Sequence, residues 1–266
     1  MGVHVFSIRF FPLLLLCCSL YNFCKTTSVI VPCYHKHAMY IKELLTAYEK
    51  QTVLPDEIVI SVSQVQKIPN NILDELQQGS WLFSVTILSS KKQLFAGQNR
   101  NIAGTHAKGD ILICQDADDL PHSQRVEIIK YFFEQYNPDF LMHQYRLSHE
   151  IDIEIFMTES YELDKIEYIN PRDYNQTWKI GWITNGNIAL TREVFAKSKW
   201  PADRGRQDVK FNKQLFRQYK DRLVIKAPIY LYRRNLSSIG GTRMDLKDQL
   251  ENNNRQRYSV LVIDND

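Results

Sequence analysis

Two carboxylates separated by one residue, Asp116 and Asp118, follow a run at residues 110–114 that is apolar after its first residue, Asp110. Because a turn just past a buried strand can direct both carboxylates toward one opening in a sheet, the pair could hold a cation. Hard oxygen ligands suit Mg²⁺ or Mn²⁺, and the oxygens of a bound diphosphate would complete the shell of such an ion. Two alternatives stay open: a solvated acidic turn, or a helix N-terminal cap in which Asp118 or Asp119 precedes Pro121.

The first half of the chain must position these carboxylates, and it alternates short apolar runs with helical stretches. This alternation predicts βαβ units and a mostly parallel sheet. The run at 110–114 follows Gly109, a residue that fits a left-handed stop for the preceding helix. We expect strands at 28–31, 57–62, 82–88, 110–114 and 139–144, and helices at 39–51, 96–108 and 125–136. Ligands of such sheets bind beyond the carboxyl ends of the strands, where the acidic segment begins.

The second half is less regular. Residues 151–157 alternate weakly, the segments 186–190 and 222–232 predict strands, and 207–219 predicts a helix. A polar segment from residue 245 onward contains a short apolar run at 260–263. We therefore expect one domain at 26–244, made of a nucleotide-binding half (26–145) and an acceptor-binding half (146–244), followed by a polar C-terminal tail at 245–266.

Residues 1–25 differ in composition from the rest of the chain. A charge-free apolar run at 10–24 is shorter than the ~20 residues that span a bilayer. We interpret it as a targeting segment, cleaved or kept as a short anchor, which would place the protein at a membrane or in the secretory lumen. The alternative is a buried leader on a cytoplasmic enzyme. Beyond this run only Cys33 and Cys114 remain, so we expect no disulfide framework.

The overall charge is nearly balanced, with 33 Lys plus Arg against 30 Asp plus Glu. This balance gives no case for a nucleic-acid partner. A local basic group, Arg233, Arg234 and Arg243, could close over a diphosphate, because expelling water strengthens contacts to phosphates. A solvated or membrane-facing patch is the alternative.

Four ordered segments resemble the motifs of family 2 glycosyltransferases. They are the opening strand and loop Ser28–Tyr34, the helix Gly97–Ala103, the step Ala107–Asp110 and the acidic Asp116–Asp119. The resemblance covers residues 28–145. It implies the GT-A fold, a Rossmann-like α/β fold whose mostly parallel central sheet, flanked by helices, binds a nucleoside-diphosphate sugar.

The resemblance also implies roles for single residues near the diphosphate. Asp118 would be the principal ligand of Mn²⁺ or Mg²⁺, and Asp116 would contact the ribose or the metal shell. Ala117 would lie with them in the donor site. Arg100 would approach the nucleotide or stabilise the acidic loop, the alternative being a surface salt bridge.

On the side of the base, the resemblance implies that Pro32, Cys33 and Tyr34 pass beside the nucleotide through backbone contacts. Tyr34 either stacks on the base or packs in the core. One segment departs from the family pattern, because Ser61–Gln64 stands where an acidic turn is usual. Ser63 could hydrogen-bond a base, but it cannot accept as an ionised carboxylate would. UDP is therefore only the default donor nucleotide.

Transfer with inversion needs a carboxylate that removes the proton of the acceptor hydroxyl. Asp208, in a segment similar to the family's acidic helix start, is the candidate base, although Gln207 stands where Glu is usual. The alternative for Asp208 is a helix N-terminal carboxylate that complements the helix dipole. Trp182 and Gly186 lie in a segment similar to the family's acceptor side. Trp182, and less so Trp178, could stack on a sugar, whereas buried tryptophans are ordinarily core residues.

The sequence therefore predicts a metal-dependent, inverting glycosyltransferase that moves a sugar from a nucleoside-diphosphate donor to a glycan, lipid or protein acceptor. One alternative is a sugar-phosphate nucleotidyltransferase. That class should carry a Gly-rich loop after the first strand, and Val31–Lys36 contains no glycine. The other alternative is an inactive binding module with the same fold.

Overall fold

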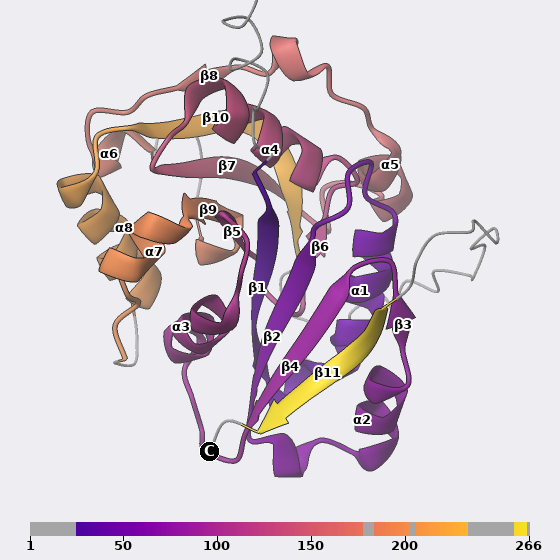
Figure 1. Ribbon diagram of the computed structural model, residues 1–266. Coiled ribbons are helices and arrows are strands. Elements are labelled where there is room, and N and C mark those ends of the chain that lie inside the picture. The colour runs from indigo at the N-terminus through magenta and orange to yellow at the C-terminus, as the bar shows by residue number, and fades with distance from the viewer. Residues whose placement is uncertain (1–24, 178–183, 203–205, 234–257, 265–266) are drawn as a thin grey trace, which may run out of the picture.

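The computed structural model describes residues 25–177, 184–202, 206–233 and 258–264. In these residues one mixed sheet has the strand order β3-β11-β4-β2-β1-β5-β9-β7-β10-β6, with β8 beside β10 (Figure 1). The strands are β1 (Thr27–Tyr34), β2 (Glu57–Ser63), β3 (Ser80–Trp81), β4 (Ser84–Ser90), β5 (Ile111–Cys114), β6 (Leu120–Pro121), β7 (Phe140–Leu147), β8 (Tyr168–Ile169), β9 (Ile188–Thr191), β10 (Arg222–Tyr232) and β11 (Tyr258–Asp264).

Helices cover both faces of this sheet, which gives three layers (Figure 1). One face carries α1 (Ile41–Glu49), α2 (Asn70–Gln77) and α4 (Arg125–Tyr136), and the other carries α3 (Ala96–His106), α7 (Arg192–Lys197) and α8 (Gln207–Gln218). Shorter helices are α5 (Ile153–Thr158), α6 (Tyr174–Thr177) and the 3₁₀ turns η1 (His35–Tyr40), η2 (Val65–Lys67), η3 (Leu163–Lys165) and η5 (Asn185–Asn187).

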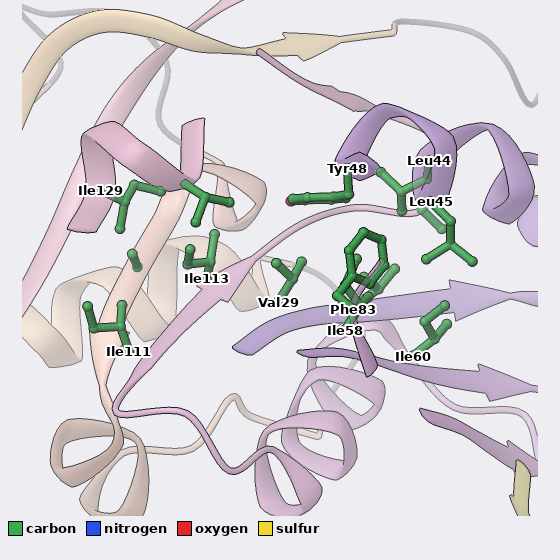
Figure 2. Packing of buried hydrophobic residues seen from close by; sticks show 14 of the residues in the cluster. Val29, Leu44, Leu45, Tyr48, Ile58, Ile60, Phe83, Ile111, Ile113 and Ile129 are labelled. Carbon is green, nitrogen blue, oxygen red and sulfur yellow. The ribbon is translucent and has the colours of Figure 1, made fainter. Parts of the chain in front are cut away.

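The core follows from the two-residue period of the central strands. In β1, Val29 and Val31 face the α1 and α4 layer, whereas Ile30 faces the layer of α3 and α8. Figure 2 shows Val29 among residues of the first layer, including Leu44 and Ile129. Because both faces are covered, the middle of each central strand is apolar on both sides, as in Val29–Val31 and Ile58–Ile60, and polar residues such as Ser28 and Ser63 lie toward the strand ends.

The strands β4, β2, β1 and β5 are all parallel, and β9 then pairs antiparallel with β5. The predicted α/β class, with a mostly parallel central sheet flanked by helices, is therefore confirmed. Cys33 and Cys114 lie on the neighbouring strands β1 and β5 but face opposite layers, and both are free thiols.

Three local expectations differ from the structure. Gly109 does not adopt the left-handed conformation; it is needed because a Cβ there would lie 2.6 Å from the backbone nitrogen of Ser28. The weakly alternating residues 151–157 form the helix α5, capped by Asp152, whose carboxylate accepts from the amides of Glu154 and Ile155. The expected polar tail contributes β11, which pairs in parallel with β4.

The apolar run at 10–24 lies outside the described residues. Among the residues that are described, no helix is long and apolar enough to cross a membrane.

Candidate active site

The acidic segment is a turn at the carboxyl end of β5. The amide of Gln115 still donates to the carbonyl of Ile30 on β1 (3.1 Å), and the amide of Asp119 then donates to the carbonyl of Asp116 (3.3 Å). Helix α4 begins only at Arg125. The alternative in which Asp118 or Asp119 caps a helix is therefore wrong.

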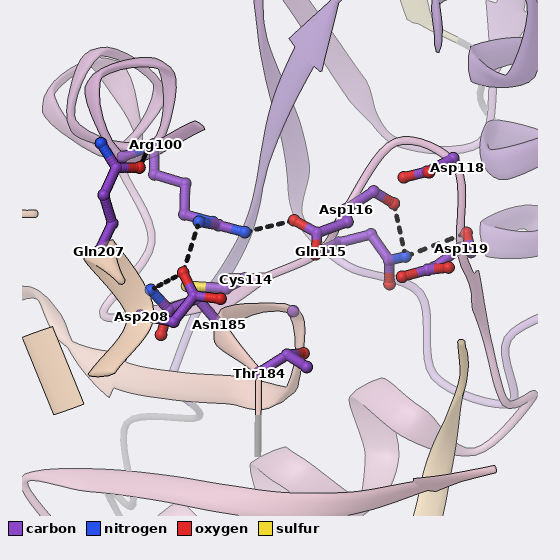
Figure 3. A network of polar contacts seen from close by, with 12 residues as sticks. Arg100, Cys114, Gln115, Asp116, Asp118, Asp119, Thr184, Asn185, Gln207 and Asp208 are labelled. Atoms are coloured by element: carbon purple, nitrogen blue, oxygen red, sulfur yellow. Dashed lines mark hydrogen bonds and ion pairs between the residues drawn. The ribbon is translucent and has the colours of Figure 1, made fainter. Parts of the chain in front are cut away.

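The side chain of Gln115 holds this turn from inside. Its amide nitrogen donates to the carbonyls of Asp116 (2.9 Å) and Asp119 (3.1 Å), as Figure 3 shows. Its amide oxygen accepts from the hydroxyl of Tyr48 (3.2 Å) and from Arg125. The nitrogen and the oxygen of the Gln115 amide are thus both hydrogen-bonded, which fixes the backbone of the turn that carries Asp116 and Asp118.

Arg100 joins the acidic turn to the candidate base. Its guanidinium forms an ion pair with Asp116, and its Nη1 lies 3.7 Å from Oδ1 of Asp208 (Figure 3). The Arg100 side chain is only 3% exposed, so the alternative of a surface salt bridge is wrong. Burial by itself lowers the pKa of Arg100, but the two carboxylates outweigh burial and raise it. Arg100 therefore stays charged between them.

Asp208 lies in the first turn of α8 and is 45% exposed. The amide nitrogen of Asn185, in η5, donates to its Oδ1 (2.9 Å). Partial burial raises the pKa of Asp208; Asp116 raises it further, and Arg100 acts in the opposite direction. A carboxylate with a raised pKa is a better proton acceptor, which suits the predicted role of general base.

Asp118 lies nearer the surface than Asp119. Its side chain is 24% exposed, and its Oδ1 lies 3.6 Å from Nδ1 of His37 in η1. Burial raises the pKa of Asp118, His37 lowers it, and Asp116 raises it. The mutual repulsion of Asp116 and Asp118 means that a cation between them would be attracted by both.

Asp116 and Asp118 offer hard carboxylate oxygens from one turn, which suits Mn²⁺ or Mg²⁺. The described residues contain no group of three or more His, Cys, Asp or Glu side chains that could hold a metal by themselves. The residues therefore fit an ion whose remaining positions are filled by a ligand such as a diphosphate.

Asp119 is a structural residue of the turn. Its carboxylate is fully buried and accepts from the hydroxyl of Tyr230 (2.6 Å) and the amide of Arg233 (2.7 Å). Burial, together with Asp118 and Asp116, raises the pKa of Asp119 well above its usual range. Both oxygens of Asp119 tie the turn to the end of β10.

Arg233 is also internal rather than part of a solvated patch. It is 3% exposed, its Nε donates to the carbonyl of Asp118 (2.6 Å), and its Nη1 pairs with Glu43 of α1 (2.8 Å). Arg234 and Arg243 lie outside the described residues.

Gly186 allows the acceptor-side segment to approach the acidic turn. A Cβ at this position would clash with the hydroxyl of Tyr230, and would lie 2.6 Å from Cζ of the same ring and 3.1 Å from Oδ2 of Asp116. The predicted acceptor-side glycine therefore lies directly against a predicted donor-side carboxylate. Trp182 and Trp178 lie outside the described residues.

The predicted base-side residues lie at the carboxyl ends of β1 and β2. Pro32 and Cys33 are buried, and Tyr34 is 37% exposed, so the alternative of a core tyrosine is wrong. Ser63 is paired in register with Tyr34, is fully buried, and donates to the carbonyl of Cys33 (3.5 Å). Ala117 is buried in the core.

Sequence reasoning missed the residues that brace this site from within. Tyr230 accepts from the amide of Asp116 (3.3 Å) and donates to Asp119, and nothing in the apolar pattern of β10 singles it out. Arg125 did leave a signal, because it occupies the first position of a buried helical stripe that continues with Ile128 and Ile129. A charge on such a stripe is unusual.

The sequence profile described as Glycosyl transferase family 2 matches residues 28–198. None of the curated proteins compared with the chain matches it in sequence.

Solved structures show the same architecture. S. aureus TarS 1-349 superposes with a TM-score of 0.61 at 18% identity, covering 78% of this chain and 60% of that one. S. aureus TarS 1-349 in complex with UDP-GlcNAc superposes with a TM-score of 0.56 at 16% identity, covering 79% of this chain and 58% of that one. At such identities the likeness establishes the fold, and the chain spans about 60% of the length of the first of these chains.

Proposed function

The chain belongs to glycosyl transferase family 2, and from this premise we propose that it transfers a sugar from a UDP-sugar to a hydroxyl of a glycan, lipid or protein acceptor, with inversion and with Mn²⁺ or Mg²⁺. One observation carries the proposal: the buried Arg100 contacts the donor-side carboxylate Asp116 and lies beside the candidate base Asp208. The groups proposed for donor binding and for proton removal therefore meet at one guanidinium.

The choice of donor is supported by the relatives. S. aureus TarS has been crystallised in complex with UDP and with UDP-GlcNAc. In this chain the carboxyl end of β1 presents the exposed ring of Tyr34, whose centroid lies 4.2 Å from that of the His35 ring and 6.1 Å from that of the His37 ring. These aromatic groups suit a planar base, and the buried Ser63 offers no carboxylate to it.

The proposed transfer proceeds in one displacement. Asp208 takes the proton of the acceptor hydroxyl, the acceptor oxygen attacks the anomeric carbon, and the bond from that carbon to the diphosphate oxygen breaks, so that UDP leaves. Arg100 keeps Asp208 and Asp116 oriented without being deprotonated. A divalent cation held by Asp118 and Asp116 would supply charge neutralisation for the leaving diphosphate.

The first experiment measures binding and cleavage of donors. We expect UDP-GlcNAc, or another member of a UDP-sugar panel, to raise the melting temperature in Mn²⁺ more than in EDTA, because ligands of the native state stabilise it. The same donor should release UDP in Mn²⁺, and faster with a mixture of hydroxyl acceptors.

The matched variants are Asp118→Asn in the acidic turn and Asp164→Asn, an exposed carboxylate in η3. Asp118→Asn should lose the Mn²⁺-dependent part of donor binding, whereas Asp164→Asn should keep it. Wild-type protein that neither binds nor cleaves any nucleotide sugar would contradict the proposed function. Equal Mn²⁺ dependence in both variants would contradict the metal assignment.

A further inference from the structure

Arg125 is a fully buried cation at the first position of α4. Among the described residues it forms no ion pair with a carboxylate. All of its hydrogen-bond partners are neutral acceptors. Burial of an unpaired charge costs several kcal/mol unless hydrogen bonds compensate for lost water. The position lies on an apolar helical stripe, where an apolar side chain would avoid this cost.

All five guanidinium N–H groups of Arg125 have an acceptor. Nε donates to Nε2 of His143 (3.3 Å), Nη1 donates to the hydroxyl of Tyr48 (3.3 Å) and to the amide oxygen of Gln115, and Nη2 donates to the carbonyls of Cys114 (2.7 Å) and Gly186 (2.6 Å). A planar fork with five donors is what distinguishes arginine from lysine. The neighbourhood is therefore built for arginine rather than for a positive charge alone.

One nitrogen of this fork joins the two halves of the candidate active site. The Cys114 carbonyl belongs to the last residue of β5, two residues before Asp116. The Gly186 carbonyl belongs to η5, where the preceding residue, Asn185, holds Asp208. The two carbonyls that share Nη2 thus belong to the segment that leads into Asp116 and to the segment whose Asn185 hydrogen-bonds Asp208.

A second arm of the fork reaches the acidic turn through Gln115. The Gln115 amide oxygen accepts from Arg125, while its nitrogen donates to the carbonyls of Asp116 and Asp119. Arg125 therefore holds the acidic turn through the side chain of Gln115 and through the backbone carbonyl of Cys114. Arg125 itself hydrogen-bonds no carboxylate of the candidate site.

We propose that Arg125 is a positioning residue for sugar transfer: by clamping Gly186 to Cys114, it fixes the candidate base Asp208 relative to the donor carboxylates. The inference rests on the proposed function, but it concerns geometry within the free protein. A displacement of about 1 Å at a reacting group can cost roughly 100-fold in rate.

Arg222 provides a matched control. It is also buried, at the start of β10, and its guanidinium donates only to backbone carbonyls, including those of Pro171 (2.7 Å) and Phe216 (2.8 Å). None of its partners belongs to the candidate active site. Arg222→Lys should therefore lower stability as Arg125→Lys does, without moving the carboxylates.

The first readout separates kcat from KM. With UDP-GlcNAc as donor and water as acceptor, Arg125→Lys should lower kcat for UDP release by roughly 100-fold while the donor KM changes less than about threefold. Arg222→Lys should leave both constants near wild type at a similar loss of melting temperature. Equal kinetic losses in the two variants, or an unchanged kcat in Arg125→Lys, would overturn the inference.

The second readout needs no substrate. Amide hydrogen exchange should become faster at 115–119 and 184–191 in Arg125→Lys, but not in Arg222→Lys. Tyr48→Phe, which keeps the ring and removes one acceptor of Arg125, should shift the same segments to a smaller extent and guards against misfolding of Arg125→Lys. Unchanged exchange at both segments in the two Arg125-directed variants would reject the clamp even if no donor were cleaved.

A double-mutant cycle connects the clamp to the base. If Arg125 acts by placing Asp208, Arg125→Lys should have little further effect on kcat in an Asp208→Asn background. Full additivity would show that Arg125 acts elsewhere. Failure of the proposed function has a different signature, because wild-type protein would then release no UDP while the exchange experiment would still report on the clamp.

Discussion

Asp208 experiences two opposing influences that fit a general base. Partial burial and the carboxylate of Asp116 raise its pKa, whereas Arg100 lowers it. Asn185 donates to one oxygen of Asp208, which leaves the other oxygen of this partly exposed carboxylate available to an acceptor hydroxyl. At the residue scale, the site thus combines a fixed orientation with an accessible proton acceptor.

Replacement of this carboxylate should therefore affect chemistry more than donor binding. We expect Asp208→Asn to lower UDP release by roughly 10²- to 10⁴-fold, the usual contribution of a general base. Donor affinity, measured by thermal shift with UDP-GlcNAc and Mn²⁺, should change little because the acidic turn is intact. Asp208→Glu keeps a carboxylate and should retain part of the rate.

The pH profile gives an independent check of the same residue. A base must be deprotonated, so kcat/KM should fall as the pH drops through the pKa of Asp208, and that pKa lies above the ordinary aspartate value. The acidic limb should therefore lie above pH ~4 and disappear in Asp208→Asn. A wild-type limb that persists unchanged in the variant would assign the base to another residue.

Only part of this chemistry could be predicted from the sequence. The placement of Asp116 and Asp118 followed from the buried strand before them, which is a local pattern. The roles of Arg100 and Asp119 depend on Asp208, Tyr230 and other partners that are distant in the chain, so no local pattern reveals them. Gln207 illustrates the same limit.

The resemblance predicts Glu at position 207, and the structure shows which contacts Gln207 makes there. Its side-chain oxygen accepts from the amide of Gly97 (3.0 Å), and its nitrogen donates to the carbonyl of Pro201 (3.0 Å). A carboxylate could not make the second contact, because it has no N–H to donate. The residue therefore fastens α8 to the start of α3 in this chain.

At the scale of elements, η5 and β10 meet closely over the acidic turn. The backbone of Gly186 lies against the ring of Tyr230, and its carbonyl accepts from Arg125. The hydroxyl of Tyr230 also hydrogen-bonds Asp116 and Asp119 at the two ends of the acidic turn. A side chain at position 186 must therefore displace either η5 or the Tyr230 ring that supports the turn.

Gly186→Ala should consequently lower both stability and activity. Overpacking of this kind typically costs about 1–3 kcal/mol, and the accompanying shift should lower kcat for UDP release. Gly104→Ala is the matched control, because its Cβ would lie 2.5 Å from the ring of Phe195, away from the acidic turn. Urea unfolding and kinetics of both variants separate the effects: Gly186→Ala with full activity per folded molecule would contradict the close-packing argument.

The elements themselves were predicted unevenly, for physical reasons. Helix α4 and strand β10 have the bounds that their apolar patterns indicate, because burial on one or two faces leaves a strong local signal. Helix α5 is short and depends on the cap supplied by Asp152, which outweighs a weak alternation. Strand β11 forms by pairing with β4, a partner far away in the chain, so its apolar run alone could not show it.

At the scale of the whole molecule, two sets of titratable groups make stability depend on pH in opposite directions. The carboxyls of Asp118, Asp119 and Asp208 have raised pKa values in the folded state, so they favour folding at low pH. Two buried histidines act the other way. Burial lowers the pKa of His122 to about 4, and burial and Arg125 lower that of His143 well below its usual range.

The histidine contribution has a defined window. Between the folded pKa of His122, about 4, and its unfolded value of 6.5, the unfolded chain binds the extra proton, so the free energy of unfolding rises with pH. His122→Gln should remove this slope without touching the acidic turn, whereas His149→Gln, at an exposed position, should not. Urea unfolding at pH 5 and pH 7 measures the difference. A histidine that folding keeps neutral lowers stability as the pH falls, because only the unfolded chain then takes up its proton. If the change in unfolding free energy between these pH values is the same in wild type and His122→Gln, folding does not keep His122 neutral.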